Sequence, residues 1–467
     1  MHNFTYIDLF SGIGGFRIPL DALGGKCLGF SEIDKTCIET YIENYGDKLS
    51  DNLGDITEIK KIPRVDLLVG GVPCQSWSVA GKMLGFDDPR GRLWYDVIRL
   101  VKLAKPKVFI FENVKGLYDP RNKQNLDFIL DSFKTLGYNV KTNLLNSYDF
   151  GVPQIRARIF IVGYHEKYSI HFSKFSFPIG TAVHDNIAKY LDGVENKDII
   201  KTKFDPEELF GERIPRARNA FQKEDELNDF FTLCDTRNGH STIHSWELIE
   251  TTEREKSIMF GIMRNRRRKR YGSKDGNPLT VSNIMDFIPD ITEEELEELI
   301  NKDLLRKKDD KYEMVNSKNS SGINGAYRLY MPYSKVFSTL TASGTRDVVV
   351  TDYVNTDLSP SDYKKEFISK IIASKKYRPL SVTETQRVQG FPDYFKPHKD
   401  EQTAKRHFGN AVSPPVIEAL VKCILSTDVF NTEVSECFST ISGIINEKVS
   451  HNNLLYQKKS AVNRVAM

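Results

Sequence analysis

The chain has 467 residues, of which 40% are hydrophobic and 28% are charged, with a formal net charge of +3. This length is enough to bury a sizeable core and predicts two or three domains. The small net charge does not by itself indicate a nucleic-acid partner, so any such surface has to be sought in local clusters.

Cysteine usage and apolar patterning indicate the cellular compartment. The six cysteines contain no CxxC pair and no regular spacing, so we predict neither a metal site nor a disulfide framework. The N-terminus enters an apolar strand pattern without a signal-like segment, and no run of about 18 apolar residues occurs. We therefore expect a cytoplasmic protein with no membrane partner.

The first part of the chain, from residue 4 to about 165, alternates short apolar segments with helix-length segments. This alternation predicts a doubly wound α/β fold with a mostly parallel sheet. Two helices are predicted at 93–104 and 126–137, the second ending at Gly137. The predicted strands are FTYIDLF, KCLGFSEID, VDLLVGG, KVFIFENV and RIFIVGY.

A glycine-rich turn follows the first predicted strand. The segment DLFSGIGGF places Gly12, Gly14 and Gly15 where a ligand can approach the backbone of an open α/β sheet. A tight turn between a strand and a helix also favours glycine for structural reasons. The spacing differs from GxGxxG, which argues against a nicotinamide cofactor.

Two acids extend this pattern. Glu32 ends the second predicted strand about 20 residues further on, where an acid can accept hydrogen bonds from a ribose, and Asp55 follows at a third strand end. Each acid taken singly is more often a surface cap or a turn residue. Together with the glycine turn, they outline a site for a cofactor that contains a nucleoside.

Reactive groups lie at other strand ends. The segment VDLLVGGVPCQSWSVAGK carries an apolar strand directly into Cys74, and a reactive cysteine is held at such an accessible turn. Glu112 ends the strand FIFENV, and Arg156 and Arg158 of QIRAR lead into another strand. A thiol, a carboxyl group and two guanidinium groups at neighbouring strand ends would form one catalytic constellation.

In order and identity, nine segments resemble the DNA (cytosine-5)-methyltransferase family, of the bacterial restriction-modification type. The resemblance covers roughly residues 4–165 and 375–425 and implies the fold of S-adenosylmethionine-dependent methyltransferases. The segments are DLFSGIGGF, SEID, GDI, GGVPCQSWS, RGRLWYDVIR, ENVKG, QIRAR, TETQRVQGFPD and GNAVSPPV.

The resemblance implies a role for each group. Cys74 would attack carbon 6 of cytosine, which makes carbon 5 nucleophilic toward the methyl group of S-adenosylmethionine. Glu112 would contact ring nitrogen 3, Arg158 would donate to the carbonyl oxygen, and Arg156 would help to order Glu112. Gln75 completes the implied catalytic set. The implied cofactor-binding residues are Phe10, Gly12, Gly14, Glu32, Ile33, Asp55, Asn410 and Val412.

The resemblance also implies the domain organisation. The reacting carbon is inaccessible in a stacked duplex, so the target cytosine must flip out of double-stranded DNA. A target-recognition domain is expected at 171–375, between a catalytic and cofactor-binding domain at 1–170 and its C-terminal part at 376–430. The tail at 431–467 has no predicted role. The expected partners are double-stranded DNA and a cognate restriction endonuclease, and the expected state is a monomer.

The expected recognition domain contains the densest basic run, RNRRRKRYGSKDGNP. Such a run is as often a solvated face as a phosphate-binding segment. Thr292 and Glu295 form a capping box before a helix, and a hairpin follows at Asp309 and Asp310, an order that resembles a winged helix. The predicted DNA-binding residues are Ser78, Arg264, Arg266, Arg267, Arg268, Lys269, Arg270, Thr339 and Leu340.

Two residues depart from the pattern of the family, and other functions are possible alternatives to DNA methylation. Val72 and Trp77 stand where the family often has Phe, and we expect activity to survive with altered packing. Methylation of tRNA is one alternative, although the Cys-Phe-Thr signature of such members is absent. A catalytically silent DNA-binding homologue is another, but the cysteine, the acid and the cofactor glycines are all present. A nicotinamide oxidoreductase explains none of the later motifs.

Overall fold

The structure is a computed structural model that divides the chain into two compact units, each built from separate stretches of sequence. The first unit comprises Met1–His184, Val336–Gly344 and Val382–Met467, and the second comprises Asp185–Lys335 and Thr345–Ser381. The residues that the structure describes are 4–73, 85–197, 230–235, 242–274, 276–315, 327–342, 348–355 and 357–431.

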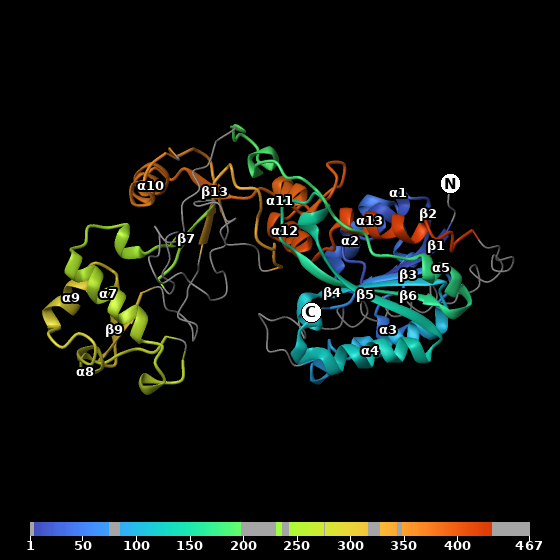
Figure 1. The fold of residues 1–467 in the computed structure, drawn as a ribbon, viewed down its shortest axis with the longest axis horizontal. Helices are drawn as coiled ribbons and strands as arrows, with labels where there is room; N and C mark the ends of the chain where they lie inside the picture. Colours follow the sequence, from blue (N-terminus) through green and yellow to red (C-terminus); the bar gives the residue numbers. More distant parts are fainter. Residues whose placement is uncertain are drawn as a thin grey trace, which may run out of the picture. The chain divides into compact units, whose positions relative to one another are not determined.

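A six-stranded sheet forms the centre of the first unit (Figure 1). The strand order is β2-β1-β3-β4-β6-β5, with β2, β1, β3 and β4 parallel to one another and β6 antiparallel to both of its neighbours. The predicted mostly parallel α/β fold is therefore confirmed. The strands are β1 (Phe4–Leu9), β2 (Gly25–Ser31), β3 (Leu67–Gly71), β4 (Val108–Val114), β5 (Tyr138–Asn146) and β6 (Ala157–His165).

Strand β5 was not predicted from the sequence. Its sequence, YNVKTNLLN, mixes apolar with polar residues and is mostly half-buried. β5 lies at the edge of the sheet and pairs only with β6. Edge strands tolerate polar side chains that a central strand does not, so a search for apolar segments passes over them.

Helices cover both faces of this sheet (Figure 1). The helices α3 (Leu93–Ala104) and α4 (Lys123–Thr135) pack on one face, and α1 (Arg17–Ala22) and α13 (Pro414–Leu425) pack on the other. Two buried clusters result because successive strand residues point to opposite faces. The range of α3 matches its prediction, and Gly137 (φ +84°) follows α4 as expected for a helix end.

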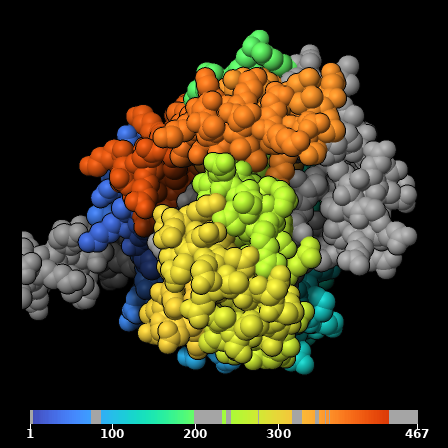
Figure 2. Space-filling model, turned by 90° about the vertical axis from the view of Figure 1, so that its left-hand side faces the viewer, coloured from blue at the N-terminus to red at the C-terminus, as the bar shows by residue number. Residues whose placement is uncertain are grey.

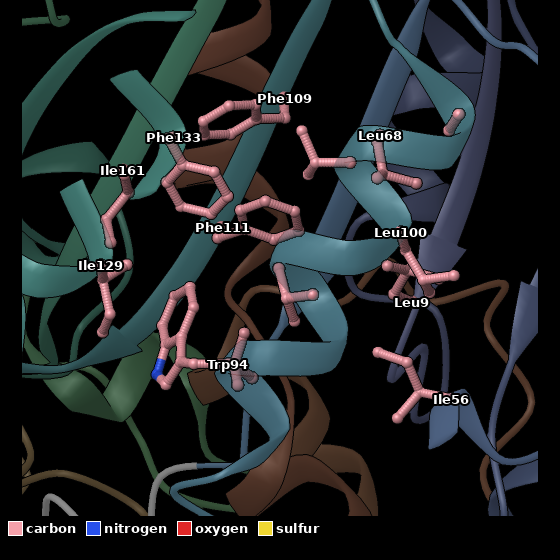
Figure 3. Packing of buried hydrophobic residues seen from close by; sticks show 14 of the residues in the cluster. Leu9, Ile56, Leu68, Trp94, Leu100, Phe109, Phe111, Ile129, Phe133 and Ile161 are labelled. Carbon is pink, nitrogen blue, oxygen red and sulfur yellow. The ribbon is translucent and has the colours of Figure 1, made fainter. Parts of the chain in front are cut away.

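Aromatic side chains fill the layer between the sheet and helices α3 and α4 (Figure 3). The ring of Phe109 lies 4.5 Å from that of Phe133 and 5.1 Å from that of Phe111, measured between centroids. Trp94 meets Phe111 edge-on at 6.1 Å. All four side chains are fully buried, and such burial contributes roughly 1.5–3 kcal/mol for each large apolar side chain. This packing fixes β4, whose end carries Glu112.

The C-terminal segment returns to the first unit as α11 (Val382–Gln389), α12 (Glu401–Asn410) and α13. Asn44, near the end of α2 (Lys35–Tyr45), binds the loop between α11 and α12. Its side-chain amide donates to the carbonyl of Lys396 at 2.8 Å and accepts from the backbone N–H of the same residue at 2.7 Å. Among the described residues of this unit, the remaining α-helix is α5 (Ser169–Lys174).

Within the described residues, Glu401–Leu425 is long and apolar enough to cross a membrane by length and composition alone. Of its most apolar window, 56% is buried inside the protein. The stretch is also divided into α12 and α13 around Ala411, and α13 packs against the sheet. These are properties of core helices.

The second unit contains a five-stranded sheet in the order β13-β12-β11-β7-β8 that the sequence analysis did not predict. Its strands have only two to four residues and come from distant parts of the chain, so no local pattern reveals them. The ring of Phe367 of α10 (Pro360–Phe367) packs against that of Phe231 of this sheet, with centroids 4.2 Å apart and the ring planes tilted by 33°. The strands are β7 (Phe230–Leu233), β8 (Thr242–Ile243), β11 (Tyr327–Tyr330), β12 (Val348–Val350) and β13 (Tyr377–Pro379).

Residues 246–315 of the second unit form what we call the helical module, which has a buried core of its own. Figure 2 shows it as one rounded body in yellow-green and yellow. Leu279 pairs antiparallel with Tyr312 of β10, so the elements have the order of a winged helix: helix, short strand, two helices and a hairpin. The elements are α7 (Glu253–Asn265), α8 (Val281–Met285), α9 (Glu293–Asn301), β9 (Leu305–Lys308) and β10 (Lys311–Met314).

Two local predictions for this module are confirmed. Thr292 and Glu295 form the capping box at the start of α9. Asp309 and Asp310 turn the hairpin with φ values of 50° and 55°, the left-handed conformation that a two-residue hairpin turn requires.

The limits of the two units differ from the predicted domain boundaries. The first unit continues to His184, beyond the expected residue 170, and the second ends at Ser381, beyond 375. Residues 336–344, expected in the recognition domain, belong to the first unit because Phe337 pairs with residues 153–155, donating to Pro153 at 2.8 Å and accepting from Ile155 at 2.9 Å. Residues 432–467 of the predicted tail lie outside the described part.

His407 of α12 links the C-terminal segment to α2. Its Nε2 lies 2.9 Å from the hydroxyl of Thr36, and only 4% of the residue is exposed. Burial lowers the pKa of His407 to about 4 because it disfavours the imidazolium ion. An unfolded histidine titrates near 6.5, so the contribution of His407 to stability is present above about pH 6.5 and is lost as the pH falls toward 4.

We expect His407→Gln to weaken this acid sensitivity, because glutamine keeps an amide for Thr36 but does not titrate. The measurement is the free energy of unfolding in urea at pH 7 and at pH 5. Between these values the native protein should lose about 2 kcal/mol more than the variant. Equal losses in the two proteins would contradict the assignment.

Candidate active site

The turn after β1 has an open backbone. Phe10 and Gly12 have φ values of +51° and +54°, and a Cβ built at Gly12 would meet no atom within 4 Å. A left-handed conformation is rare for a side chain as bulky as Phe10 and marks a constrained turn. The space beside Gly14 is filled by Tyr45, whose hydroxyl donates to the carbonyl of Gly14 at 3.0 Å. The turn therefore has free space beside Gly12, whereas Tyr45 fills the space beside Gly14.

Glu32 lies directly after β2 and faces this turn. One of its carboxylate oxygens accepts the N–H of Gly12 at 2.9 Å, and the other accepts the N–H groups of Ile33 at 2.7 Å and Asp34 at 2.8 Å. These bonds fix the carboxylate while leaving acceptor capacity on the oxygen next to Gly12. Ile33 is 70% exposed and offers an apolar surface beside it.

Asn52, which the sequence analysis missed, holds the neighbouring turn against Glu32. Its side chain accepts from the N–H of Glu32 at 3.1 Å and of Gly54 at 3.0 Å, and it donates to the carbonyl of Glu32 at 3.0 Å. This brings the turn that carries Asp55 to the end of β2. Asp55 is exposed, and its carboxylate accepts from the N–H and the hydroxyl of Thr57 at 2.9 and 2.8 Å.

Val412 brings the C-terminal segment to the same edge of the sheet. Its carbonyl lies so close to Gly15 that a Cβ there would collide with it, and its Cγ2 is 3.4 Å from the Cβ position of Gly71. Val412 therefore sits beside the turn after β1 and the end of β3. Asn410, the last residue of α12, is exposed. The predicted cofactor residues thus come from four separate segments of the chain.

Glu112 and Arg158 form a buried ion pair beside this edge. The Nε of Arg158 lies 2.9 Å from a carboxylate oxygen of Glu112, and the two side chains are 16% and 9% exposed. Burial raises the pKa of Glu112 above its ordinary value, against the opposing effects of Arg158 and Arg156. A carboxyl group with a raised pKa can hold a proton near neutral pH and donate it.

Val72, two residues before Cys74 in the sequence, is hydrogen-bonded next to Glu112. The N–H of Val72 donates to the carbonyl of Glu112 at 3.2 Å, and the side chain of Asn113 donates to the carbonyl of Val72 at 3.2 Å. Val72 and Asn113 are both buried. Cys74, Gln75, Trp77 and Ser78 lie between Pro73 and residue 85, outside the residues that the structure describes.

Arg156 is a positioning residue in this structure. Its buried guanidinium donates to the carbonyls of Leu340 at 3.0 Å, Gly409 at 3.1 Å and Ala411 at 2.9 Å. A charged group at 3% exposure needs such acceptors. Arg156 therefore ties the start of β6 to the segment 336–342 and to the C-terminal segment that carries the predicted cofactor residues.

Gln154 extends this buried network. Its amide donates to Gln389 at 2.9 Å and accepts from the N–H of Leu340 at 2.9 Å, and Gln389 in turn donates to Ala411 at 2.7 Å. The side chain of Leu340 is buried at 4% exposure, so its predicted contact with DNA is not supported. The hydroxyl of Thr339, which is partly exposed, donates to the carbonyl of Ile155 at 2.6 Å.

The predicted DNA-binding basic run divides into exposed and buried members. Arg266 is 2% exposed, and its prediction as a phosphate contact is wrong for this conformation. The reason is helical spacing, since Arg266 follows the buried Met259 and Ile262 by seven and four residues and its N–H continues the helix to Ile262. The exposed members are Arg264, Arg267, Arg268, Lys269 and Arg270.

Asp34, Cys37 and His407 are grouped closely enough to resemble a metal site, with donor atoms within 4.8 Å of one another. The carboxylate of Asp34 in this group already has partners within the protein. The hydroxyl of Thr36 donates to Asp34 at 2.6 Å, and the guanidinium of Arg406 lies 3.5 Å from the same carboxylate. Because the guanidinium already supplies the positive charge, we interpret the group as a link between α2 and α12.

The residues around Gly12 fit a cofactor that contains a nucleoside. The open turn admits a ligand to the backbone, the fixed carboxylate of Glu32 can accept hydroxyl hydrogen bonds, and Ile33 offers an apolar surface to a base. The acid–guanidinium pair of Glu112 and Arg158 lies on the neighbouring strands β4 and β6. The arrangement is suited to group transfer beside a cofactor.

Comparisons with known proteins agree with this arrangement. The profile of the family described as C-5 cytosine-specific DNA methylase matches residues 4–426. The chain is 49% identical over 442 residues to the type II methylase M.HgiEI of Herpetosiphon aurantiacus, covering 93% of this chain and 100% of that protein. It is 32% identical over 451 residues to the type II methyltransferase M.BanI of Aneurinibacillus aneurinilyticus, covering 93% and 97%.

Among solved structures, the methyltransferase EhMeth of Entamoeba histolytica has a TM-score of 0.50 at 14% identity, covering 91% of this chain and 99% of that one, which is a likeness of fold. The family profile and the relatives matched over their full length show the family as well as the fold. The chain therefore belongs to the family of C-5 cytosine-specific DNA methylases and is a DNA (cytosine-5)-methyltransferase whose methyl donor is S-adenosylmethionine.

Proposed function

We propose that this enzyme methylates carbon 5 of one cytosine within a short sequence of double-stranded DNA, through a covalent bond between Cys74 and carbon 6. The observation that carries the proposal is the buried pair of Glu112 and Arg158 at the sheet edge where the chain leaves β3 for Pro73. Bound S-adenosylmethionine supplies the methyl group.

Cys74 is the proposed nucleophile. It follows Val72 by two residues, a span of at most about 7 Å between Cα atoms, and Val72 is hydrogen-bonded to the backbone of Glu112. The thiolate bonds to carbon 6 and the electrons of the 5,6 double bond make carbon 5 nucleophilic. After methylation, carbon 5 loses its proton and the thiolate leaves, which restores the double bond.

Glu112 is the proposed proton donor to ring nitrogen 3. Charge builds on that nitrogen as the thiolate adds to carbon 6, and a protonated carboxyl group relieves it. The raised pKa of Glu112 supports this role, because it keeps the proton available at higher pH. The hydrogen bonds of Val72 to Glu112 and Asn113 join the end of β4 to the segment that precedes Cys74 in the sequence.

Arg158 is the proposed donor to the carbonyl oxygen of the cytosine. Its Nε is engaged with Glu112, and its Nη1 donates to the carbonyl of Ala157 at 3.0 Å. Among the described residues, no hydrogen bond from its Nη2 is found, so this nitrogen can donate to a bound base. A single guanidinium would thus orient the acid and stabilise the ring charge.

The DNA must present the cytosine outside the helix, because carbon 6 is covered in a stacked duplex. We infer that the second unit supplies sequence recognition and that Thr339 and Ser78 lie near the DNA backbone. The full-length relatives are named type II methylases, which supports a restriction-modification setting with a cognate endonuclease. We infer a monomer in the bacterial cytoplasm.

The first test is methylation itself. Incubation with unmethylated DNA and S-adenosylmethionine, followed by bisulfite sequencing, should give methylated cytosines confined to one short motif. Cys74→Ala should abolish transfer while leaving cofactor binding unchanged. Methylation of tRNA in place of DNA would favour the RNA alternative. Cofactor binding without transfer to either substrate would identify a catalytically silent homologue.

The role of Glu112 is tested by Glu112→Gln, which keeps the shape of the side chain but cannot donate the proton. We expect kcat to fall by about 10²–10⁴-fold. Because the protonated acid is the active form, the native kcat should fall as the pH rises through the pKa of Glu112, and the variant should lose this alkaline limb.

Glu166→Gln is the matched control, since Glu166 is exposed and lies in the same unit. It should keep the native rate and pH profile. An alkaline limb that persists in Glu112→Gln would assign that limb to another group and remove Glu112 as the donor.

A further inference from the structure

The helical module separates its charges into two groups. Every charged residue between 264 and 274, which we call the basic loop, is Arg or Lys. By contrast, five of the nine residues of α9 are glutamate. These include Glu293 and Glu294 in the first turn, which are exposed. The module therefore presents a cationic and an anionic surface from different elements.

Helix α9 occupies the place of a recognition helix but has the wrong charge for that role. In helix-turn-helix proteins the N-terminal residues of the recognition helix contact base edges between the phosphate backbones. The first turn of α9 carries Glu293, Glu294 and Glu295, and Asp290 precedes it. Like charges brought together at an interface cost several kcal/mol, so this helix is unsuited to enter a DNA groove.

The basic loop has the opposite character. Arg264, Arg268 and Lys269 are exposed, and no ion pair with an acid is found for them in the described part of the chain. Arg270 lies over the ring of Tyr271 at 4.6 Å and 3.4 Å from Asp286, so its charge is partly compensated. Within the described residues, Arg264, Arg268 and Lys269 are therefore cations for which no acidic partner is found.

Asn277 holds the basic loop in one conformation. Its buried side chain donates to the carbonyls of Arg266 at 2.9 Å, Gly272 at 3.3 Å and Lys274 at 3.0 Å, and it accepts from the N–H of Lys274 at 3.0 Å. A loop fixed in this way loses little conformational entropy on binding. The cations are thus presented from a preorganised backbone.

A purely structural reading explains only part of this loop. Arg264 lies in the last turn of α7, where a cation stabilises the helix dipole. Arg268 and Lys269 lie beyond the end of the helix and have no such partner. Both cations are exposed and can therefore contact a ligand.

We propose that the basic loop, and not α9, is the surface by which the helical module binds DNA, through the phosphate backbone and without reading base identity. The inference rests on the proposed function in that its ligand is double-stranded DNA. The positive charge of the loop is complementary to the negative charge of the phosphates, and each neutralised phosphate releases condensed counterions. The module would then strengthen binding to any sequence.

The test compares three variants by their affinity for a random-sequence DNA duplex over a range of salt concentrations. The first carries Arg264→Gln, Arg268→Gln and Lys269→Gln. The second carries Glu293→Gln, Glu294→Gln, Glu297→Gln and Glu298→Gln on α9. The third, a control for net charge, carries Lys60→Gln, Lys61→Gln and Lys102→Gln at exposed positions of the first unit.

We expect the loop variant to bind at least about tenfold more weakly, with a salt slope shallower by roughly 2 to 3. The α9 variant and the charge control should stay within about threefold of the native affinity. A slope unchanged in the loop variant, or equal changes in the loop variant and the charge control, would overturn the proposal. So would a gain of tenfold or more in the α9 variant, which would indicate that α9 faces the DNA.

Methylation provides an independent readout. The loop variant should show a raised KM for DNA with kcat within about twofold of the native value. A large loss of kcat would assign the loop to catalysis and would also overturn the proposal. A native protein that binds DNA without methylating it would refute the proposed function, while the salt slopes would still decide the role of the loop.

Discussion

The catalytic unit depends on the buried guanidinium of Arg156. Its three carbonyl acceptors belong to residues 340, 409 and 411, far from it in the sequence. Gln154 and Gln389 satisfy further buried polar groups in the same place. A buried network of this kind is stable only when every member has its partner, so it specifies one arrangement of the segments.

Two parts of the active site follow from that arrangement. The carbonyl of Ala411 is held by Arg156 and Gln389, and the next residue, Val412, lies against the glycine turn after β1. Arg156 also begins the segment that runs into β6, whose Arg158 pairs with Glu112. The groups expected to hold the cofactor and those expected to contact the base are therefore anchored to one network.

The sequence predicted much of this structure, and the exceptions have physical causes. Helix α3 and the hairpin at Asp309 and Asp310 depend on local periodicity and turn chemistry, which the sequence displays directly. Strand β5 and the five-stranded sheet were missed because edge strands and very short strands carry little apolar signal. Pairing between Phe337 and residues 153–155 is a long-range contact, which no local pattern reports.

The same distinction applies to the site residues. Glu112, Arg158 and Glu32 could be found because they end predicted strands or lead into one. Asn52 and Gln389 could not be found, since each acts by hydrogen bonds to backbone atoms that only the folded chain brings near. The burial of Arg266 was available from its spacing to Ile262, a signal that the density of the basic run concealed.

The sequence separation between Arg156 and its acceptors also has a consequence for folding during translation. Two of its three acceptors lie more than 250 positions later in the chain, so the carbonyl groups that make the burial of this cation possible are missing until residue 411 has emerged from the ribosome. The helical module has its own core and its contacts are local, so it can fold earlier. The intervening length itself adds little to the closure entropy, which grows only with the logarithm of loop size. The arrangement around Arg156 can therefore form only after residue 411 has been translated.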